Sequence, residues 1–146
     1  EGATHRADFK IEELVEFVCA ASSSEEEFQQ SLASMHAALD KAAEKVRKKT
    51  PAQKDLIGQV DALIDTLYFT YGSFALMGVD PERIFDIVHE ANMGKVFPDG
   101  KAHFDPVTHK ILKPDDWDEK YAPEPAIRKE LQRQLKAYER HKERNK

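Results

Sequence analysis

Apolar side chains recur every three or four residues along one stretch of this chain, a spacing typical of an amphipathic α-helix. The stretch lies within residues 25–49, and its apolar positions are Phe28, Leu32, Met35, Leu39, Ala42 and Val46. Side chains at these intervals share one helix face, so they form a seam that packs against another helix. Packing between helices is therefore the first constraint on the fold.

Start and stop signals predict four further helices. Ser24 and Glu27 form a capping-box pattern at the beginning of the helix over residues 25–49. Thr50-Pro51 opens the next helix, Gly78 ends it, and Asp80-Pro81 caps the one that follows. The predicted helices cover about residues 6–21, 25–49, 51–77, 81–92 and 125–144. The expected fold class is all-α, a helical bundle of about five helices.

The segment between the fourth and fifth helices, residues 93–124, does not follow the helical pattern. Its glycines and prolines exclude a long helix, and they are Gly94, Pro98, Gly100, Pro106, Pro114 and Pro123. Phe97 and Trp117 argue against disorder, and a short hairpin is expected around Asp99-Gly100. A long ordered loop in a compact domain is usually functional. This irregular loop is also rich in lysine.

Length and composition limit the classes of protein to which the chain can belong. With 146 residues, 40% of them hydrophobic, a single domain over residues 1–146 is expected. The net charge of −5 argues against nucleic acid as a partner, and no apolar run has membrane-spanning length. Cys19 is expected to be a buried small hydrophobe. With no signal-peptide pattern present, the lone cysteine favours a cytoplasmic location.

Two groups of acidic residues interrupt apolar helix faces. The first group is Glu12, Glu13 and Glu16, and the second is Asp61 and Asp65. Residues three or four apart share a helix face, so the carboxylates within each group can converge. A carboxylate that faces a core is costly unless a positive charge joins it. A divalent metal ion is the simplest such charge, and it favours an enzyme that acts on phosphates.

If the first and third helices pack side by side, Glu13, Glu16, Asp61 and Asp65 meet in one pocket. Hard oxygen ligands of this kind suit Mg²⁺, with Mn²⁺ as the second choice. A single motif of this kind is more often a solvated helix face, whereas two such groups on apolar helix faces favour a metal site. Di-iron bundles supply Glu-x-x-His pairs, and no histidine stands three residues after any of these four carboxylates. Iron redox chemistry is therefore disfavoured.

The same residues resemble the all-α NTP pyrophosphatase (MazG-like) superfamily, which includes phosphoribosyl-ATP pyrophosphohydrolases and dimeric dUTPases. The superfamily signature is an E-E-x-x-E helix followed by an E-x-x-D helix. The resembling runs are Phe9 to Glu16 and Gly58 to Asp65. A loop of one branch is similar to three further runs, which are Ala91 to Lys95, Asp99 to Lys101, and His109 to Pro114.

The resemblance implies a ligand set for the metal. By position, Glu13 and Glu16 are the ligands of the first motif, and Asp61 is the aspartate of the second. Gly58 stands where the second motif has its glutamate. Either Asp65 supplies the missing ligand one turn later, or Gln59 holds a metal-bound water.

The resemblance also implies an activity, which is hydrolysis of a nucleoside triphosphate or a related nucleotide to the monophosphate and pyrophosphate. Glu12 or Asp65 would take the proton of the attacking water. Lysines of the loop would bind phosphates as point charges, and Asn92 would bind a base or a ribose. The lysines are Lys95, Lys101, Lys110 and Lys113. Superfamily members form dimers or dimers of dimers, so a homodimer or homotetramer is expected.

Two alternatives stay open at this point. In the first, the chain is a non-enzymatic helical module that binds a partner protein, and its carboxylates form salt bridges with Arg6 or Lys10. In the second, the fold is the same and the substrate is a phosphoribosyl nucleotide. Substitution of Glu13 and Asp61 separates the first alternative from an enzyme, because loss of a buried ion-pair partner alters folding whereas loss of a metal ligand alters activity.

Overall fold

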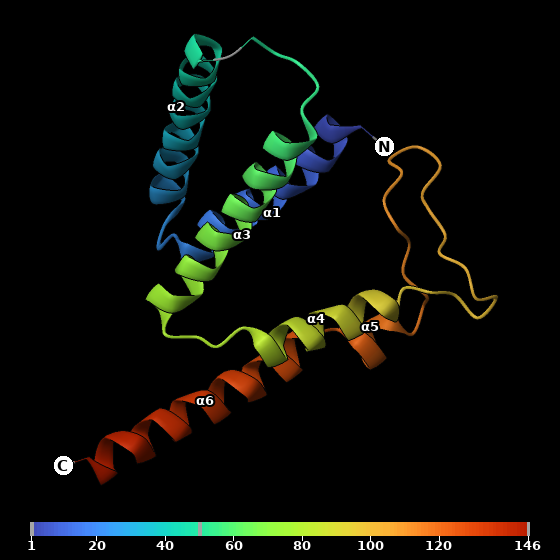
Figure 1. The fold of residues 1–146 in the computed structure, drawn as a ribbon. Coiled ribbons are helices and arrows are strands. Elements are labelled where there is room, and N and C mark those ends of the chain that lie inside the picture. The colour runs from blue at the N-terminus through green and yellow to red at the C-terminus, as the bar shows by residue number, and fades with distance from the viewer. Residues whose placement is uncertain (1, 50, 146) are drawn as a thin grey trace. The chain divides into compact units, whose positions relative to one another are not determined.

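A computed structural model describes residues 2–49 and 51–145 of the chain, and the described part is all-α (Figure 1). Its helices are α1 (Ala3–Ala21), α2 (Glu25–Lys49), α3 (Leu56–Met77), α4 (Glu82–Met93), α5 (Trp117–Tyr121) and α6 (Glu124–Arg144). The predicted all-α class and the five long helices are confirmed. The short helix α5 lies within the segment that was predicted to be an irregular loop.

The chain divides into two compact units, Glu1–Asp55 and Leu56–Lys146. The first unit is a hairpin of α1 and α2. The predicted capping box forms at the start of α2, where the Glu27 backbone N–H donates to Ser24 Oγ at 3.2 Å. In a capping box the Glu27 side chain accepts from the backbone N–H of Ser24, but here its Oε2 accepts from the backbone N–H of Ser23, one residue earlier, at 2.7 Å. Two helix-start donors are thereby satisfied.

The seam of α2 contacts α1 along the first half of its length. Phe28, Leu32 and Met35 are half-buried, as are Val15 and Val18 of α1. The later seam positions Leu39 and Val46 are both more than 60% exposed. The predicted packing face is therefore confirmed where the two helices adjoin, and the remainder of α2 carries apolar side chains on its surface.

Cys19 does not occupy the buried position that was predicted for it. The cysteine is exposed on α1. It lies one residue beyond Val18, about 100° around the helix, so it is turned away from the side that α2 covers. A two-helix hairpin buries only one side of each helix, and apolar neighbours in sequence do not ensure burial.

In the second unit, α3 begins at Leu56 and not at Thr50-Pro51. Residues 51–55 are not helical, and Thr50 lies outside the described residues. The predicted opening at Pro51 is therefore wrong by about one and a half turns. Asp55, immediately before the helix, is a residue type that competes with helical hydrogen bonding and is favoured at helix starts.

Helix α3 presents apolar side chains on all sides and buries none of them. Ile57 is 83% exposed, Leu76 is 92% exposed, and Tyr68 and Tyr71 are exposed as well. Within the described residues, no single helix is both long and apolar enough to cross a membrane. Helices α3 and α4 reach that threshold only as a pair, and they are bent by 119° at the break between them.

Helix α4 packs against α6 (Figure 1), and the buried carboxylate of Glu130 lies at their contact. Glu130 is 7% exposed and accepts two hydrogen bonds from Arg133, at 2.8 and 2.7 Å. Arg83 of α4 lies 3.9 Å from the same carboxylate. Gln134 donates to Glu130 at 3.0 Å and exchanges hydrogen bonds with both backbone groups of Asp80. The network ties the turn before α4 to the middle of α6.

The long loop contains two narrow antiparallel turns. Val96 pairs with Ala102 and Phe104 pairs with Ile111. The first turn confirms the predicted hairpin around Asp99-Gly100, and Gly100 has a positive φ of 77°, a conformation that glycine adopts readily. Asp99 reinforces it by accepting from the Lys101 backbone N–H at 2.9 Å.

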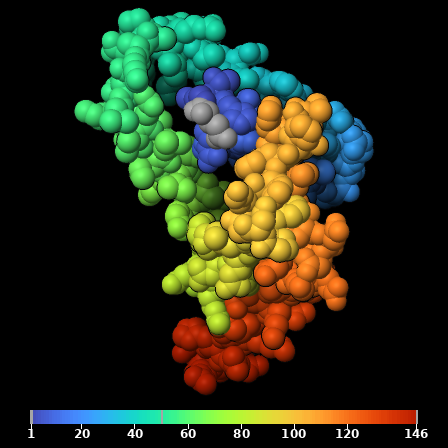
Figure 2. All heavy atoms as spheres, turned by 90° about the vertical axis from the view of Figure 1, so that its right-hand side faces the viewer, coloured from blue at the N-terminus to red at the C-terminus, as the bar shows by residue number. Residues whose placement is uncertain are grey.

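Trp117 anchors the end of this loop against α4. Its side chain is 6% exposed, and its Nε1–H donates to the Ala91 carbonyl at 2.8 Å. Ala91 is itself buried, at 4% exposed. Gly94 follows the last residue of α4 and lies close to Tyr121, so that a Cβ at residue 94 would be 2.5 Å from the Tyr121 ring. In the space-filling view the yellow and orange atoms of this region form one continuous surface (Figure 2).

The Glu130 network makes the stability of the second unit depend on pH. Hydrogen bonds from Arg133 and then from Gln134 lower the pKa of Glu130 from 4.5 to about 2. The unfolded chain therefore binds more protons between these two values, and stability falls as the pH is lowered through that range. We expect Glu130→Gln to lower the thermal unfolding midpoint at pH 7, and the difference from the parent to shrink toward pH 2.

Glu139→Gln is the matched control, because Glu139 is an exposed carboxylate on the same helix. It should leave the unfolding midpoint nearly unchanged at both pH values. A constant difference between Glu130→Gln and the parent from pH 5 to pH 2 would contradict the ionic role assigned to Glu130.

Two glycine substitutions test the packing at the end of α4. Gly94→Ala places its Cβ on the Tyr121 ring, and overpacking of this kind costs about 1–3 kcal/mol. Gly72→Ala meets open space within α3 and should be neutral or stabilising by about 0.5–1 kcal/mol. Denaturant unfolding measures both changes, and equal effects of the two would contradict the close approach at residue 94.

Candidate functional site

The first group of carboxylates stands in the middle of α1. Glu12, Glu13 and Glu16 are all exposed. Glu12 and Glu16 are four residues apart, and Glu13 and Glu16 are three apart, so the three side chains lie on one side of a single helical turn. The helix holds them at a spacing that lets at least two oxygen-bearing side chains contact the same ligand.

The second group stands on α3, in the other unit. Asp61 and Asp65 are exposed and one turn apart. Gly72 lies seven residues beyond Asp65 on the same side of the helix, and no atom outside its own helix neighbourhood comes within 4 Å of where its Cβ would be. The aspartates are therefore accessible along the helix surface.

The premise that these carboxylates face a core is wrong in the described structure. All five are exposed, so no burial cost attaches to their charges. Within the described ranges, no three Asp, Glu, His or Cys side chains are placed so as to hold a metal ion together. The convergence of the α1 and α3 groups in one pocket stays a prediction, because it joins helices of different units.

A third group of predicted residues does come together, at the end of α4. Lys95 donates from Nζ to Asn92 Oδ1 at 2.7 Å. The same ammonium group lies 5.8 Å from the centroid of the Trp117 ring, and Lys113 Nζ lies 4.0 Å from it. Each such cation–π contact stabilises by about 0.5–1 kcal/mol at an exposed site. Two of the five predicted substrate-binding residues, Lys95 and Lys113, thus lie against one indole, and a third, Asn92, is bonded to Lys95.

The other two lysines occupy the hairpins of the loop. Lys101 accepts at its carbonyl from the Phe97 backbone N–H at 2.9 Å, in the first turn. The Lys110 carbonyl accepts from the Asp105 backbone N–H at 2.8 Å, in the second turn. Both side chains are exposed. Their predicted role in substrate binding stays a prediction.

Hydrogen bonds favour the ionised form of two loop carboxylates, Asp99 and Asp105. The His103 ring, followed by the Lys101 backbone N–H, lowers the pKa of Asp99. Backbone N–H groups of Thr108 and Val107 lower the pKa of Asp105. These are the Asx-type contacts that hold tight turns. They give the lysine-bearing loop a defined local conformation.

Sequence reasoning missed the position of Trp117. In the sequence the tryptophan indicates only that the loop is ordered, although it is the one tryptophan in the chain and follows Lys113-Pro114 closely. Aromatic rings near lysines are common partners of their ammonium groups, so this proximity was the available signal. The contact with Lys95, which is 22 residues away, depends on the fold of the loop and could not be read from spacing.

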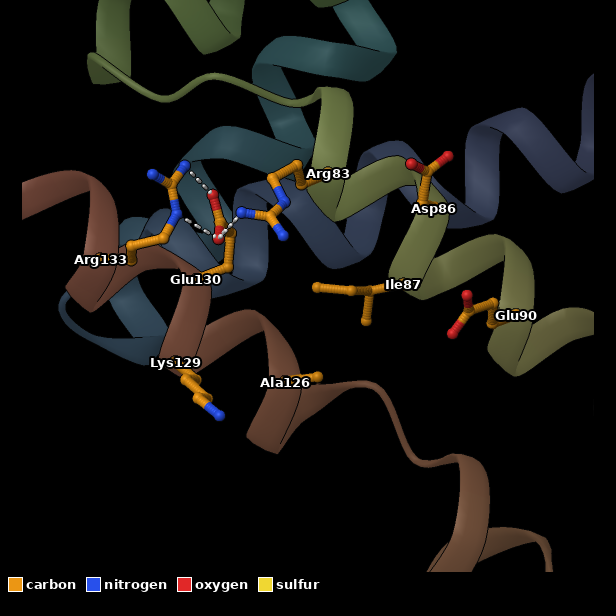
Figure 3. A pocket seen from close by; sticks show the side chains of 8 residues that line it. All are labelled: Arg83, Asp86, Ile87, Glu90, Ala126, Lys129, Glu130 and Arg133. Carbon is orange, nitrogen blue, oxygen red and sulfur yellow. Dashed lines mark hydrogen bonds and ion pairs between the residues drawn. The ribbon is translucent and has the colours of Figure 1, made fainter.

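A cavity of the second unit lies elsewhere, between α4 and α6 (Figure 3). It measures about 490 Å³ and is lined by Arg83, Asp86, Ile87, Glu90, Ala126, Lys129, Glu130 and Arg133. None of the predicted site residues is among them. In Figure 3 the guanidinium groups of Arg83 and Arg133 both point at Glu130. An ion-pair network lines this cavity, and none of the residues proposed for catalysis or substrate binding belongs to it.

Comparisons with known proteins agree with the resemblance in the sequence. The sequence model of the phosphoribosyl-ATP pyrophosphohydrolase family matches residues 1–92. A solved structure of a candidate NTP pyrophosphohydrolase from Exiguobacterium sp. 255-15 is 40% identical, with a TM-score of 0.81, over 92% of this chain and 80% of its own. No curated protein matches the chain.

The chain therefore belongs to the phosphoribosyl-ATP pyrophosphohydrolase family, within the all-α NTP pyrophosphatase group. The predicted family and the predicted enzyme class, a pyrophosphohydrolase, are confirmed. The match ends at Asn92, so the lysine-bearing loop, α5 and α6 lie beyond the region that the family model describes.

Proposed function

We propose that the chain hydrolyses a nucleoside triphosphate, or a related nucleotide, to the monophosphate and pyrophosphate. The observation that carries the proposal is the 40% identity to the Exiguobacterium protein over 92% of the chain. That match extends over both units, which supports residues 1–146 acting as one catalytic domain. A phosphoribosyl nucleotide is the second candidate substrate, and the family description favours it.

A divalent metal ion fits the carboxylates that the chain provides. Glu13, Glu16, Asp61 and Asp65 offer only hard oxygen donors, all of them exposed, and no sulfur or nitrogen ligand is among them. These donors would hold Mg²⁺, or Mn²⁺ in its place. Such an ion neutralises phosphate oxygens and lowers the pKa of a bound water.

Glu12, or Asp65 where it is not fully committed to the metal, would accept the proton. Glu12 is one helical turn before Glu16 on α1, and Asp65 is one turn after Asp61 on α3. Either residue can accept a proton from an attacking water held beside the ligand group, because an ionised carboxylate is an acceptor at neutral pH. Asn92 would orient the base or the ribose, and the loop lysines would hold the phosphates.

A second copy of the chain is the proposed cover for α3. Its apolar side chains are exposed along the whole helix, and exposed apolar patches of this kind mark interaction surfaces. A homodimer or homotetramer would bury them and would bring further helices beside the carboxylates of α1 and α3.

Two substitutions test the carboxylate site directly. We expect Glu13→Gln and Asp61→Asn each to reduce kcat by about 100-fold or more, because each removes a ligand worth several kcal/mol of charge stabilisation. Thermal unfolding should change little, since both side chains are exposed. Release of pyrophosphate from a nucleoside triphosphate in the presence of Mg²⁺ measures the effect.

Glu44→Gln on α2 is the control, because it removes an exposed carboxylate that forms a surface pair with Lys48. It should keep the parental kcat. Full activity in Glu13→Gln and Asp61→Asn would rule out the proposed site, and loss of folding in either would favour a structural ion pair.

A further inference from the structure

We propose that Trp117 is the positioning residue of a diphosphate clamp, in which it holds Lys95 and Lys113 ready to bind the phosphate chain of the substrate. The inference rests on the proposed function, and it deepens that function by assigning the segment beyond Asn92 the task of recognising phosphate. Trp117 itself does not contact phosphate in this arrangement. It fixes the two ammonium groups that do.

The indole is held in place before any ligand arrives. It is buried at 6% exposed, and its Nε1–H donates to the Ala91 carbonyl at 2.8 Å. Trp117 is also the first residue of α5, and the Tyr121 ring at the other end of that helix lies against Gly94. The ring is thus attached both to the end of α4 and to α5, so its position does not depend on the mobile ends of the lysines.

The two lysines reach this ring from opposite ends of the loop. Lys113 Nζ lies 4.0 Å from the ring centroid and Lys95 Nζ lies 5.8 Å from it. Lys95 is half-buried, and its ammonium group is also held by Asn92 at 2.7 Å. Each ammonium group can make three hydrogen bonds, so donors remain for an anion. Two like charges held at one ring repel each other, and a bound phosphate chain removes that repulsion.

One carboxylate competes for this site. Asp118 lies 3.9 Å from Lys113, but its side chain is 85% exposed and the pair is therefore well solvated. Pairs of this kind are weak. A diphosphate group carries more negative charge than a carboxylate and offers more acceptor oxygens, so it displaces Asp118 from Lys113. The exchange needs only a rotation of an exposed side chain.

The clamp lies outside the part of the chain that the family model matches. Residues 1–92 match, whereas Lys95, Lys113 and Trp117 all follow. The carboxylates of α1 and α3 are inside the matched part. The proposed clamp therefore lies in a segment that the family model does not describe, whereas the carboxylates proposed to hold the metal lie in the segment that it does.

The single tryptophan makes the clamp directly observable. Inorganic pyrophosphate, titrated in the presence of Mg²⁺, should give a saturable change in the fluorescence of Trp117, because binding moves two charges beside the ring. Lys95→Gln and Lys113→Gln should each weaken that binding by about tenfold or more. Lys120→Gln is the matched control, since Lys120 is a lysine of the same segment that is already paired with Asp116.

A double-mutant cycle separates positioning from a general loss of stability. Trp117→Phe keeps an aromatic ring but loses the hydrogen bond to Ala91, and Trp117→Ala loses both. We expect KM for the nucleotide to rise about tenfold in Trp117→Ala and less in Trp117→Phe, with kcat changed by less than about threefold. In the background of Lys95→Gln and Lys113→Gln together, Trp117→Ala should raise KM no further, because the groups it positions are gone.

The outcomes distinguish failure of the clamp from failure of the proposed function. Metal-dependent pyrophosphate release that is unaffected by Lys95→Gln and Lys113→Gln would overturn the clamp and leave the function standing. Saturable pyrophosphate binding without turnover of any nucleotide would support the clamp and overturn the proposed function. If Trp117→Ala lowers the unfolding midpoint, KM is measured instead for Trp117→Phe, at a temperature where that variant is folded. A KM equal to that of the parent would assign Trp117 a structural role only.

Discussion

The hydrogen bond from the Trp117 indole to the Ala91 carbonyl connects the two halves of the second unit. Ala91 belongs to the last turn of α4, and Trp117 begins α5 at the far end of a loop of more than 20 residues. Closing a loop of this length costs conformational entropy, and the turns within it make only local hydrogen bonds. A buried aromatic ring with its N–H satisfied supplies the long-range contact that the turns lack. The arrangement of Lys95 and Lys113 follows from that contact.

A second constraint is the small amount of surface that the chain buries by itself. Among the described residues, buried side chains are found only at Ala91, Trp117 and Glu130. No helix of the second unit packs on α3 as extensively as α4 packs on α6. An apolar helix of this kind is stable in water only when something covers it. The carboxylates Asp61 and Asp65 share that helix, so assembly and catalysis are expected to depend on the same surface.

Periodicity and capping signals were sufficient to predict α2, where the Ser24–Glu27 box forms with a shift of one residue in its second bond. They failed at the start of α3, because proline at a first helical position is permitted but not obligatory there. The burial of Cys19 was inferred from apolar neighbours, and it is wrong because α2 covers only one side of α1. The carboxylate groups were found from spacing within a helix. The lysine–tryptophan cluster was not, because it depends on contacts across 22 residues of loop that no local pattern records.

The most direct test of the central claim is the product formed from a panel of nucleoside and deoxynucleoside triphosphates, together with a phosphoribosyl nucleotide, with Mg²⁺, with Mn²⁺ and with EDTA. A metal-dependent pyrophosphohydrolase releases pyrophosphate and the matching monophosphate in equal amounts with either ion, and releases neither with EDTA. The panel also ranks the substrates by kcat/KM. Release of orthophosphate in place of pyrophosphate, or turnover that EDTA does not affect, would contradict the proposed reaction.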